Sequence, residues 1–118
     1  MDEEMKGFLT DLDVQRGKYR LLLELVKEQD ALIRAKQFDA LMRLFERKRA
    51  VMEEIEQVER RMAPVKAKWP EVREAMAEGE RKEVETLLND VGELLKELLH
   101  LEEEGRRTME EQQKGNAG

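Results

Sequence analysis

The residues that could do chemistry in this sequence gather around its single histidine. His100 precedes Glu103 and Glu104 by three and four positions, a spacing that puts side chains on one face of a helix. One histidine with two carboxylates could hold a metal ion. His100 also lies beside Leu99 and Leu101, and the simpler interpretation is a histidine at the edge of an apolar stripe. We therefore predict no metal site.

Acid–base catalysis is the other chemistry that this region could support. The consecutive carboxylates Glu102, Glu103 and Glu104 would need pKa values shifted by burial, and nothing in the pattern predicts a concave core around them. The sequence has no cysteine, which excludes thiolate chemistry and disulfides. It also has no glycine-rich phosphate loop. We expect a protein that is not an enzyme and needs no cofactor.

A short basic cluster is the best candidate for binding nucleic acid. It comprises Arg43, Arg47, Lys48 and Arg49. No aromatic residues suited to base stacking are interleaved with it, and the chain has a net charge of −6. We expect no nucleic-acid binding, and we predict that these side chains face solvent or acidic neighbours.

The composition is typical of long helices. Charged residues make up 42% of the 118 residues, aromatic residues only 4%, and hydrophobic residues 40%. This hydrophobic content is too high and too regularly spaced for a disordered chain. The length fits one domain, which we place at residues 1–112, followed by a polar, disordered tail at 113–118.

Apolar residues at steps of three and four predict the first two long helices. The first is expected at residues 3–35, with a broad stripe through Phe8, Leu12 and Leu22. The second is expected at residues 38–62, where the stripe has one polar interruption, Lys48. Lys36-Gln37 is a weak helix breaker. One continuous helix through this point is therefore the alternative.

Two prolines and a glycine mark the next boundary. Pro64 should end the second helix or begin a new turn. Pro70 disfavours helical geometry at Trp69 and suits the start of a short helix at residues 71–78. Gly79 should end that helix. Trp69 is expected to cap one end of the bundle, with a role as a partner anchor as the alternative.

The last long helix is predicted at residues 81–112, again from three-four spacing of valine and leucine. Such wide stripes must pack on each other or on a partner. The sequence therefore predicts an all-α protein. Its expected architecture is three long antiparallel helices in an elongated bundle or coiled coil, with a short connecting helix after Trp69.

Charge is unevenly distributed along the chain. Residues 1–33 carry a net charge of −3, residues 34–70 a net +4, and residues 71–118 a net −7. A basic middle helix between two acidic helices would place opposite charges side by side. Each exposed pair contributes little, about 0–1 kcal/mol, so the pattern favours a packing order more than it adds stability.

The last helix has more apolar residues than one antiparallel neighbour easily covers. The functional interpretation is a groove that takes an amphipathic helix of a protein partner. Internal core or a homodimer contact is the competing interpretation. The residues concerned, which we take as the candidate partner-binding set, are Leu94, Leu95, Leu98, Leu99, Leu101 and Met109.

Residues 22–55 read LLELVKEQDALIRAKQFDALMRLFERKRAVMEEI. This segment resembles the FlgN-type flagellar export chaperones and, more loosely, their FliT-type relatives, and residues 87–109 resemble the long last helix of that family. The resemblance implies a cytoplasmic chaperone without a cofactor. Its partners would be the helical C-terminal segments of hook–filament junction subunits, which it would keep unassembled and deliver to the flagellar type III export apparatus.

The expected location agrees with the rest of the sequence. The N-terminal residues 1–4 are acidic apart from Met1 and lack the apolar run of a secretory signal. No stretch approaches the roughly 18 apolar residues that a membrane span needs. We expect a cytoplasmic protein without a membrane span.

Overall fold

The computed structural model describes residues 3–117, and these residues form four helices and no strand. The prediction of an all-α fold is confirmed. The helices are α1 (Glu3–Arg34), α2 (Phe38–Ala67), α3 (Trp69–Ala75) and α4 (Glu78–Ala117). No helix within residues 3–117 is long and apolar enough to cross a membrane.

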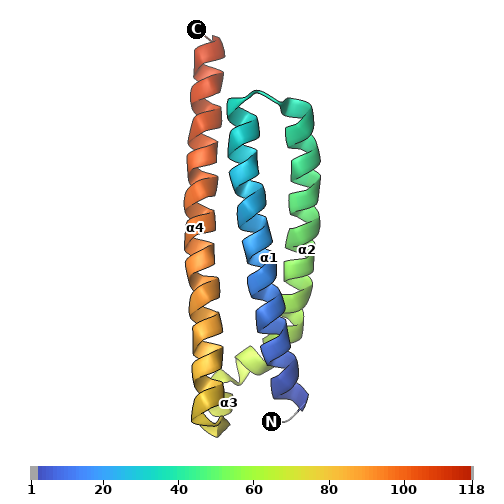
Figure 1. The fold of residues 1–118 in the computed structure, drawn as a ribbon, viewed down its shortest axis with the longest axis vertical. Helices are drawn as coiled ribbons and strands as arrows, with labels where there is room; N and C mark the ends of the chain where they lie inside the picture. Colours follow the sequence, from blue (N-terminus) through green and yellow to red (C-terminus); the bar gives the residue numbers. More distant parts are fainter. Residues whose placement is uncertain (1–2, 118) are drawn as a thin grey trace.

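The three long helices lie side by side in an elongated molecule (Figure 1). α1 and α4 run in one direction, α2 runs in the other, and the short helix α3 crosses the end at which α4 begins. The molecule measures 62 × 21 × 20 Å, and its radius of gyration is 18.3 Å. A compact globule of about 100 residues would have a radius of gyration near 13 Å. The fold therefore exposes much of its helical surface.

The acidic helix α1 occupies the central position. It packs along both α2 and α4, whereas α2 and α4 lie further from each other. The basic helix α2 thus does not lie between the two acidic helices, as the order along the chain suggested. The physical reason is the width of the apolar stripe on α1, where Leu22, Leu23, Leu25 and Val26 are all buried and can cover two neighbours.

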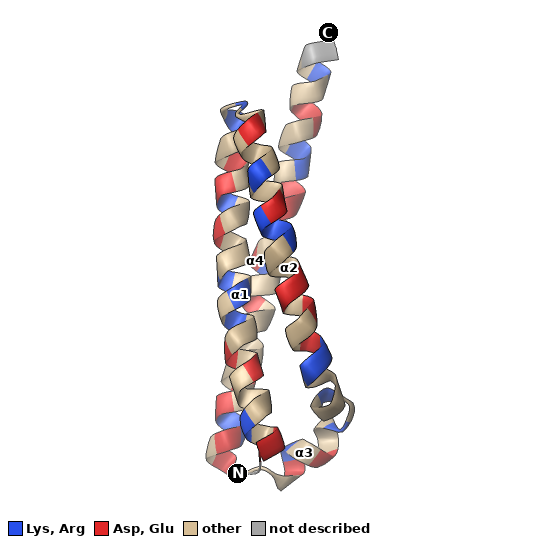
Figure 2. Cartoon of the chain, turned by 90° about the vertical axis from the view of Figure 1, so that its right-hand side faces the viewer, with Lys and Arg blue, Asp and Glu red and all other residues tan. Residues whose placement is uncertain are grey.

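Opposite charges still meet across the helix boundaries. Arg47 and Arg61 of α2 pair with Glu28 and Asp11 of α1. Basic and acidic residues are interspersed along α1 and α2 (Figure 2), whereas residues 83–104 of α4 include eight acidic residues and one basic residue, Lys96.

The core has two parts. The part near the α1–α2 turn is built from residues of all three long helices. The part near α3 is built from the start of α1, the end of α2, the start of α4 and Met76. Each helix contributes side chains at three-four spacing, which keeps one face of the helix inside. The most completely buried are Leu12, Val26, Ile33, Leu44, Met62 and Val84.

A turn at residues 35–37 separates α1 from α2, and the continuous helix is excluded. Lys36 has a φ of 56°. The backbone N–H of Lys36 bonds the carbonyl of Ile33 across 3.1 Å, and that of Gln37 bonds the carbonyl of Leu32 across 3.0 Å. This pair of bonds is a Schellman motif. The sequence signal was weak because a lysine occupies the left-handed position that glycine usually takes.

Pro64 does not end α2, contrary to prediction. The helix continues to Ala67, although a proline inside a helix costs about 3 kcal/mol. Met62 and Val65, on either side of Pro64, are both buried. Their burial in the core near α3 offsets the hydrogen bond that proline cannot make.

The boundary between α3 and α4 also differs from the prediction. Helix α3 begins at Trp69 and ends at Ala75, rather than spanning 71–78, and Gly79 lies in the first turn of α4. The break occurs at Met76, whose backbone is extended (φ −78°, ψ 146°) and whose side chain is buried. Burial of Met76 fixes the break, while Glu78 and Glu80 favour the start of α4 electrostatically.

Helix α4 also extends further than predicted, through Ala117. Residues 113–117 are therefore helical where the sequence predicts a disordered tail; residue 118 lies outside the described residues. Two features support this helix end. Residues 110–114 are all good helix formers, and the Gln112 side chain donates a hydrogen bond to the Ile33 carbonyl across 3.1 Å.

Candidate protein-binding face

The structure divides the six candidate residues of the last helix into two groups. Leu98 is buried in the core, and Leu94, Leu95 and Leu101 pack partly buried against it. Leu99 and Met109 are exposed, with 67% and 37% of their surfaces accessible. Leu99 and Met109 are therefore the members most accessible to a partner, while Leu95 is half-buried.

Helix α2 carries a second exposed stripe that the sequence analysis missed. Phe38, Met42 and Met52 are 58%, 62% and 51% exposed, and Phe45 is partly buried. These residues recur at three-four spacing beside the buried stripe of the same helix. That spacing was visible in the sequence, but it could not be separated from the core stripe before the position of α1 was known.

The middle part of each stripe points away from the contacts with α1. The ion pairs that link α1 to its neighbours include Lys18–Glu54, Arg47–Glu28 and Lys27–Glu97. In a helix with 3.6 residues per turn, side chains two positions apart point in nearly opposite directions. Four exposed or half-buried residues lie two positions from a residue that pairs with α1, and their side chains therefore point away from α1. They are Phe45, Met52, Leu95 and Leu99.

The same two stripes border a polar bridge between α2 and α4. Lys48 Nζ lies 2.6 Å from Glu102 Oε1 and 2.7 Å from Gln29 Oε1. Phe45 and Met52 lie one turn before and after Lys48, and Leu99 lies one turn before Glu102. The Lys48 ammonium is also 5.7 Å from the centre of the Phe45 ring. The bridge therefore places the apolar residues of both helices along one side of the molecule.

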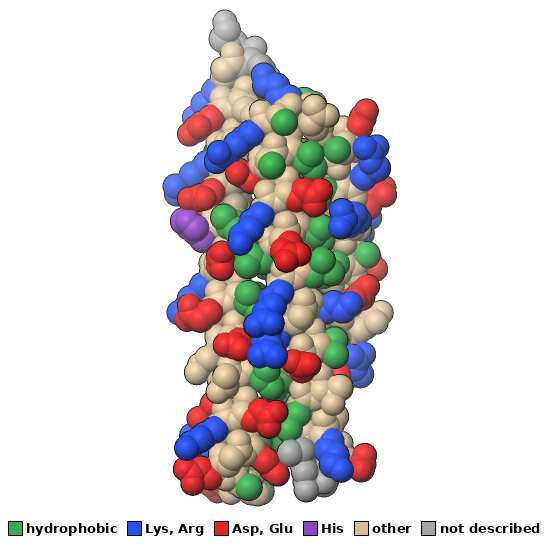
Figure 3. Space-filling view, in the orientation of Figure 1, with side chains coloured by type: hydrophobic (Ala, Val, Ile, Leu, Met, Phe, Trp, Pro, Cys, Tyr) green, Lys and Arg blue, Asp and Glu red, His purple; other side chains and the backbone are tan. Residues whose placement is uncertain are grey.

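We name this side the α2–α4 face. Two shallow hollows lie along it, one containing Phe45 and Met52 and the other between Phe38 and Met109. At 1.5 Å per residue, the stripe from Phe38 to Met52 extends over about 21 Å. The opposite side, formed by α1, shows charged side chains set among its apolar ones (Figure 3). The α2–α4 face comprises Phe38, Met42, Phe45, Met52, Leu95, Leu99 and Met109.

The carboxylates near His100 are each held by a cation or by the histidine itself. Glu102 pairs with Lys48, Glu104 lies 3.1 Å from His100 Nε2, and Glu103 binds Arg106 and Arg107. The hydrogen bond from Arg106 lowers the pKa of the Glu103 carboxyl, which keeps it ionised. Within the described residues no group of three or more His, Cys, Asp or Glu side chains could hold a metal ion. The contacts of this region link side chains along and between helices.

Two residues of the basic cluster of α2 also form ion pairs with neighbouring helices. Arg47 pairs with Glu28 of α1, and Lys48 with Glu102 of α4. Arg47 and Lys48 therefore point towards different neighbouring helices, and their charges are each paired with a carboxylate.

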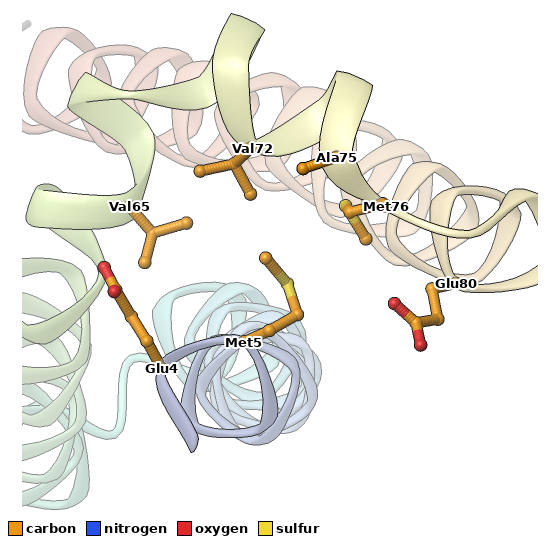
Figure 4. Close-up of a pocket in the computed structure, with 7 residues that line it drawn as sticks. All are labelled: Glu4, Met5, Val65, Val72, Ala75, Met76 and Glu80. Atoms are coloured by element: carbon orange, nitrogen blue, oxygen red, sulfur yellow. The ribbon is translucent and has the colours of Figure 1, made fainter. Parts of the chain in front are cut away.

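The end of the molecule at α3 holds a small apolar pocket (Figure 4). Trp69 packs against the same part of the core, and the centre of its ring lies 5.8 Å from that of Phe8. The pocket has a volume of about 190 Å³. Its lining comes from all four helices and the α3–α4 link: Glu4, Met5, Val65, Val72, Ala75, Met76 and Glu80.

The fold and its exposed faces define an all-helical bundle. Comparison of the chain with models of protein families, with curated proteins and with solved structures finds no match. The resemblance to flagellar export chaperones therefore stays a prediction from the residues.

Proposed function

We propose that the three long helices form a stable elongated bundle and that this bundle binds an amphipathic helix of another protein on the α2–α4 face. The observation that carries the proposal is the pair of apolar stripes. Phe38, Met42 and Met52 on α2 and Leu99 on α4 are more than half exposed, on the side that α1 leaves uncovered. Exposed apolar residues grouped in this way mark protein-binding surfaces.

The shape of the face favours a helical ligand. Two neighbouring helices with apolar stripes present a shallow trough, and an amphipathic helix can lie in it with side chains at three-four spacing. A stripe of about 21 Å would accommodate about four turns of the bound helix. Methionines at Met42, Met52 and Met109 can adapt to different apolar side chains because their chains are flexible and polarizable.

We further propose that the bound helix is the C-terminal segment of a protein of the hook–filament junction and that the chain is a cytoplasmic export chaperone. The resemblance of residues 22–55 to FlgN-type chaperones supports this choice. An unassembled junction protein exposes an apolar helix face that promotes aggregation. Covering that face requires no catalytic residue and no cofactor, in keeping with the absence of cysteine and of phosphate-loop motifs from the sequence.

Self-association is the second candidate function. The same α2–α4 face could cover its counterpart on another copy of the chain and give a homodimer, because antiparallel helix pairs can pack face to face. This alternative requires no other protein. It predicts an oligomer that persists on dilution in sedimentation analysis, whereas the chaperone proposal predicts a monomer that binds its client one to one.

The test is binding of purified C-terminal segments of junction proteins, measured by calorimetry, to the intact protein and to Met52→Asp and Leu99→Asp variants. These positions are chosen because they are exposed, so a charge there should leave the fold intact. Leu94 and Leu98 are unsuitable because they contact the core. We expect each substitution to weaken binding by about tenfold or more, as for residues at the centre of an interface.

Leu21→Asp is the matched control. Leu21 is 38% exposed and lies on α1, outside the α2–α4 face. Equal affinity of all three variants and the intact protein would reject the face as the binding site. Absence of binding by the intact protein, together with a dilution-resistant oligomer, would favour self-association.

A further inference from the structure

The pocket at the α3 end combines an apolar interior with an acidic rim. Val65 and Val72 face Met5 and Met76 across the space, while the carboxylates of Glu4 and Glu80 lie at its two sides (Figure 4). Met5, Val65 and Met76 are buried, so the interior is a fixed part of the core. The pocket is separate from the α2–α4 face.

The two rim carboxylates have no cationic partner among the described residues. Within residues 3–117, neither Glu4 nor Glu80 forms an ion pair or a hydrogen bond through its side chain, although many acidic side chains of the protein do. The nearby Arg81 instead donates hydrogen bonds to the backbone carbonyls of Arg73 and Met76. The rim therefore carries two negative charges that no described side chain compensates.

A ligand that fits both parts needs an aliphatic chain and a cationic end. A volume of about 190 Å³ exceeds the roughly 150 Å³ that holds a benzene molecule in an engineered apolar cavity, so a four-carbon chain can enter. Lysine has this construction, because its methylene stem packs on apolar surface while its ammonium group stays at the water boundary. An anionic side chain would be repelled by Glu4 and Glu80.

We propose that this pocket binds a lysine side chain of a protein partner, with the stem between Val72 and Met76 and the ammonium group at the acidic rim that Glu4 and Glu80 form. The pocket would then be a second contact site at the end of the bundle. It would recognise one basic residue, whereas the α2–α4 face would recognise an apolar helix stripe. Neither site requires the other.

The first experiment uses pentylammonium chloride as the probe and the methionine methyl resonances as the readout. We expect saturable shifts at Met5 and Met76, and none at Met42, which lies on α2 away from the pocket. The double variant Glu4→Gln/Glu80→Gln removes the charge of the rim and should weaken binding about fivefold, the upper range for an exposed charge contact. Neutral 1-pentanol should bind more weakly than the ammonium compound.

The matched control is the double variant Glu3→Gln/Glu78→Gln. Glu3 and Glu78 lie in the first turns of α1 and α4, as Glu4 and Glu80 do, but they do not line the pocket. Equal weakening by both double variants would assign the effect to general charge at the helix starts and overturn the proposal. So would the absence of saturable shifts at Met5 and Met76 in the intact protein.

A second experiment tests the source of the ammonium group. A capped peptide with one central lysine is compared with the same peptide carrying norleucine, which keeps the stem and removes the charge. We expect the lysine peptide alone to shift the Met5 and Met76 resonances. Binding of pentylammonium without binding of the lysine peptide would overturn the assignment to a protein partner.

Discussion

The ammonium group of Lys48 donates a hydrogen bond of 2.6 Å to the Glu102 carboxylate, and this contact ties α2 directly to α4. The Lys48 side chain is only 13% exposed, and Gln29 of α1 accepts a second hydrogen bond from it. The polar interruption of the apolar stripe on α2 is therefore the point at which all three long helices meet. A partly buried polar contact of this kind can fix the register of packed helices.

Removing one member of this bridge should cost more than removing an exposed ion pair. We expect Lys48→Ala to lower the free energy of unfolding by about 1–3 kcal/mol, because Glu102 and Gln29 lose their partner. Lys18→Ala, which breaks the more exposed pair with Glu54, should cost about 0–1 kcal/mol. Urea unfolding followed by circular dichroism measures both. Equal losses in the free energy of unfolding for the two variants would show that the burial of Lys48 adds nothing to the stability of the protein.

The phenol of Tyr19 should make stability fall in strongly alkaline solution. Burial, reinforced by the hydrogen bond that its hydroxyl donates to Glu59 and by the Glu59 charge, raises the pKa of Tyr19 from 10.0 to about 12. The unfolded chain therefore releases this proton at lower pH than the folded chain does. The contribution of Tyr19 is complete below pH 10 and is lost as the pH rises towards 12.

Tyrosinate absorbance measures this shift directly, because the sequence has a single tyrosine. A titration midpoint of the folded protein near 10 would contradict the prediction. Unfolding experiments at increasing alkaline pH should show a steeper loss of stability for the intact protein than for Tyr19→Phe, which keeps the ring and has no titrating hydroxyl.

A glycine in place of Lys36 in the turn between α1 and α2 should stabilise the protein. Lys36 adopts a left-handed backbone with a φ of 56°, which costs a non-glycine residue roughly 1–2 kcal/mol. We expect Lys36→Gly to stabilise the protein by about 0.5–1 kcal/mol after the greater freedom of glycine in the unfolded chain is counted. Thermal melting should show a rise of about 2–5 °C. Lys36→Val should lower the melting temperature, and an equal effect of both substitutions would argue against the backbone explanation.

Gly105 offers a test of how tightly α4 approaches the polar bridge. It is buried, and a Cβ atom added there would lie 3.6 Å from Gln29 Nε2, an ordinary contact. Gly105→Ala should therefore stabilise the helix by about 0.5–1 kcal/mol. A Cβ atom added at Gly92 would meet no other atom within 4 Å, so Gly92→Ala should stabilise α4 by a similar amount.

A larger side chain at the same place should have the opposite effect. Gly105→Leu would displace Gln29 from Lys48 and should lower the free energy of unfolding by about 1–3 kcal/mol, as other overpacked substitutions do. Urea unfolding distinguishes the variants. If Gly105→Leu were as stable as Gly105→Ala, α4 would have room to move away from α1 at this level.

Local sequence patterns were sufficient to predict where the long helices lie, but they were insufficient to predict the residues at which the helices begin and end. The three-four spacing of apolar residues predicted each long helix because it depends only on 3.6 residues per turn. The helix ends predicted at Pro64 and Gly79 were wrong because burial of Met62, Val65 and Met76 outweighs local preference. The structure places Leu98 of the candidate set inside, because α1 lies next to that side of α4.

The amino-acid sequence was enough to predict that this chain is all-helical, that it has neither thiols nor a phosphate-binding loop, and that its helices have more apolar surface than one neighbour can cover. Which helix is central, and therefore which apolar stripes stay exposed, became clear from the packing of the three long helices. The physical reason is that a helix with two adjoining stripes, such as α2 with Leu44 on one and Met52 on the other, can bury either one. Packing against α1 and the bridge between Lys48 and Glu102 determine which of the two stripes on α2 is buried.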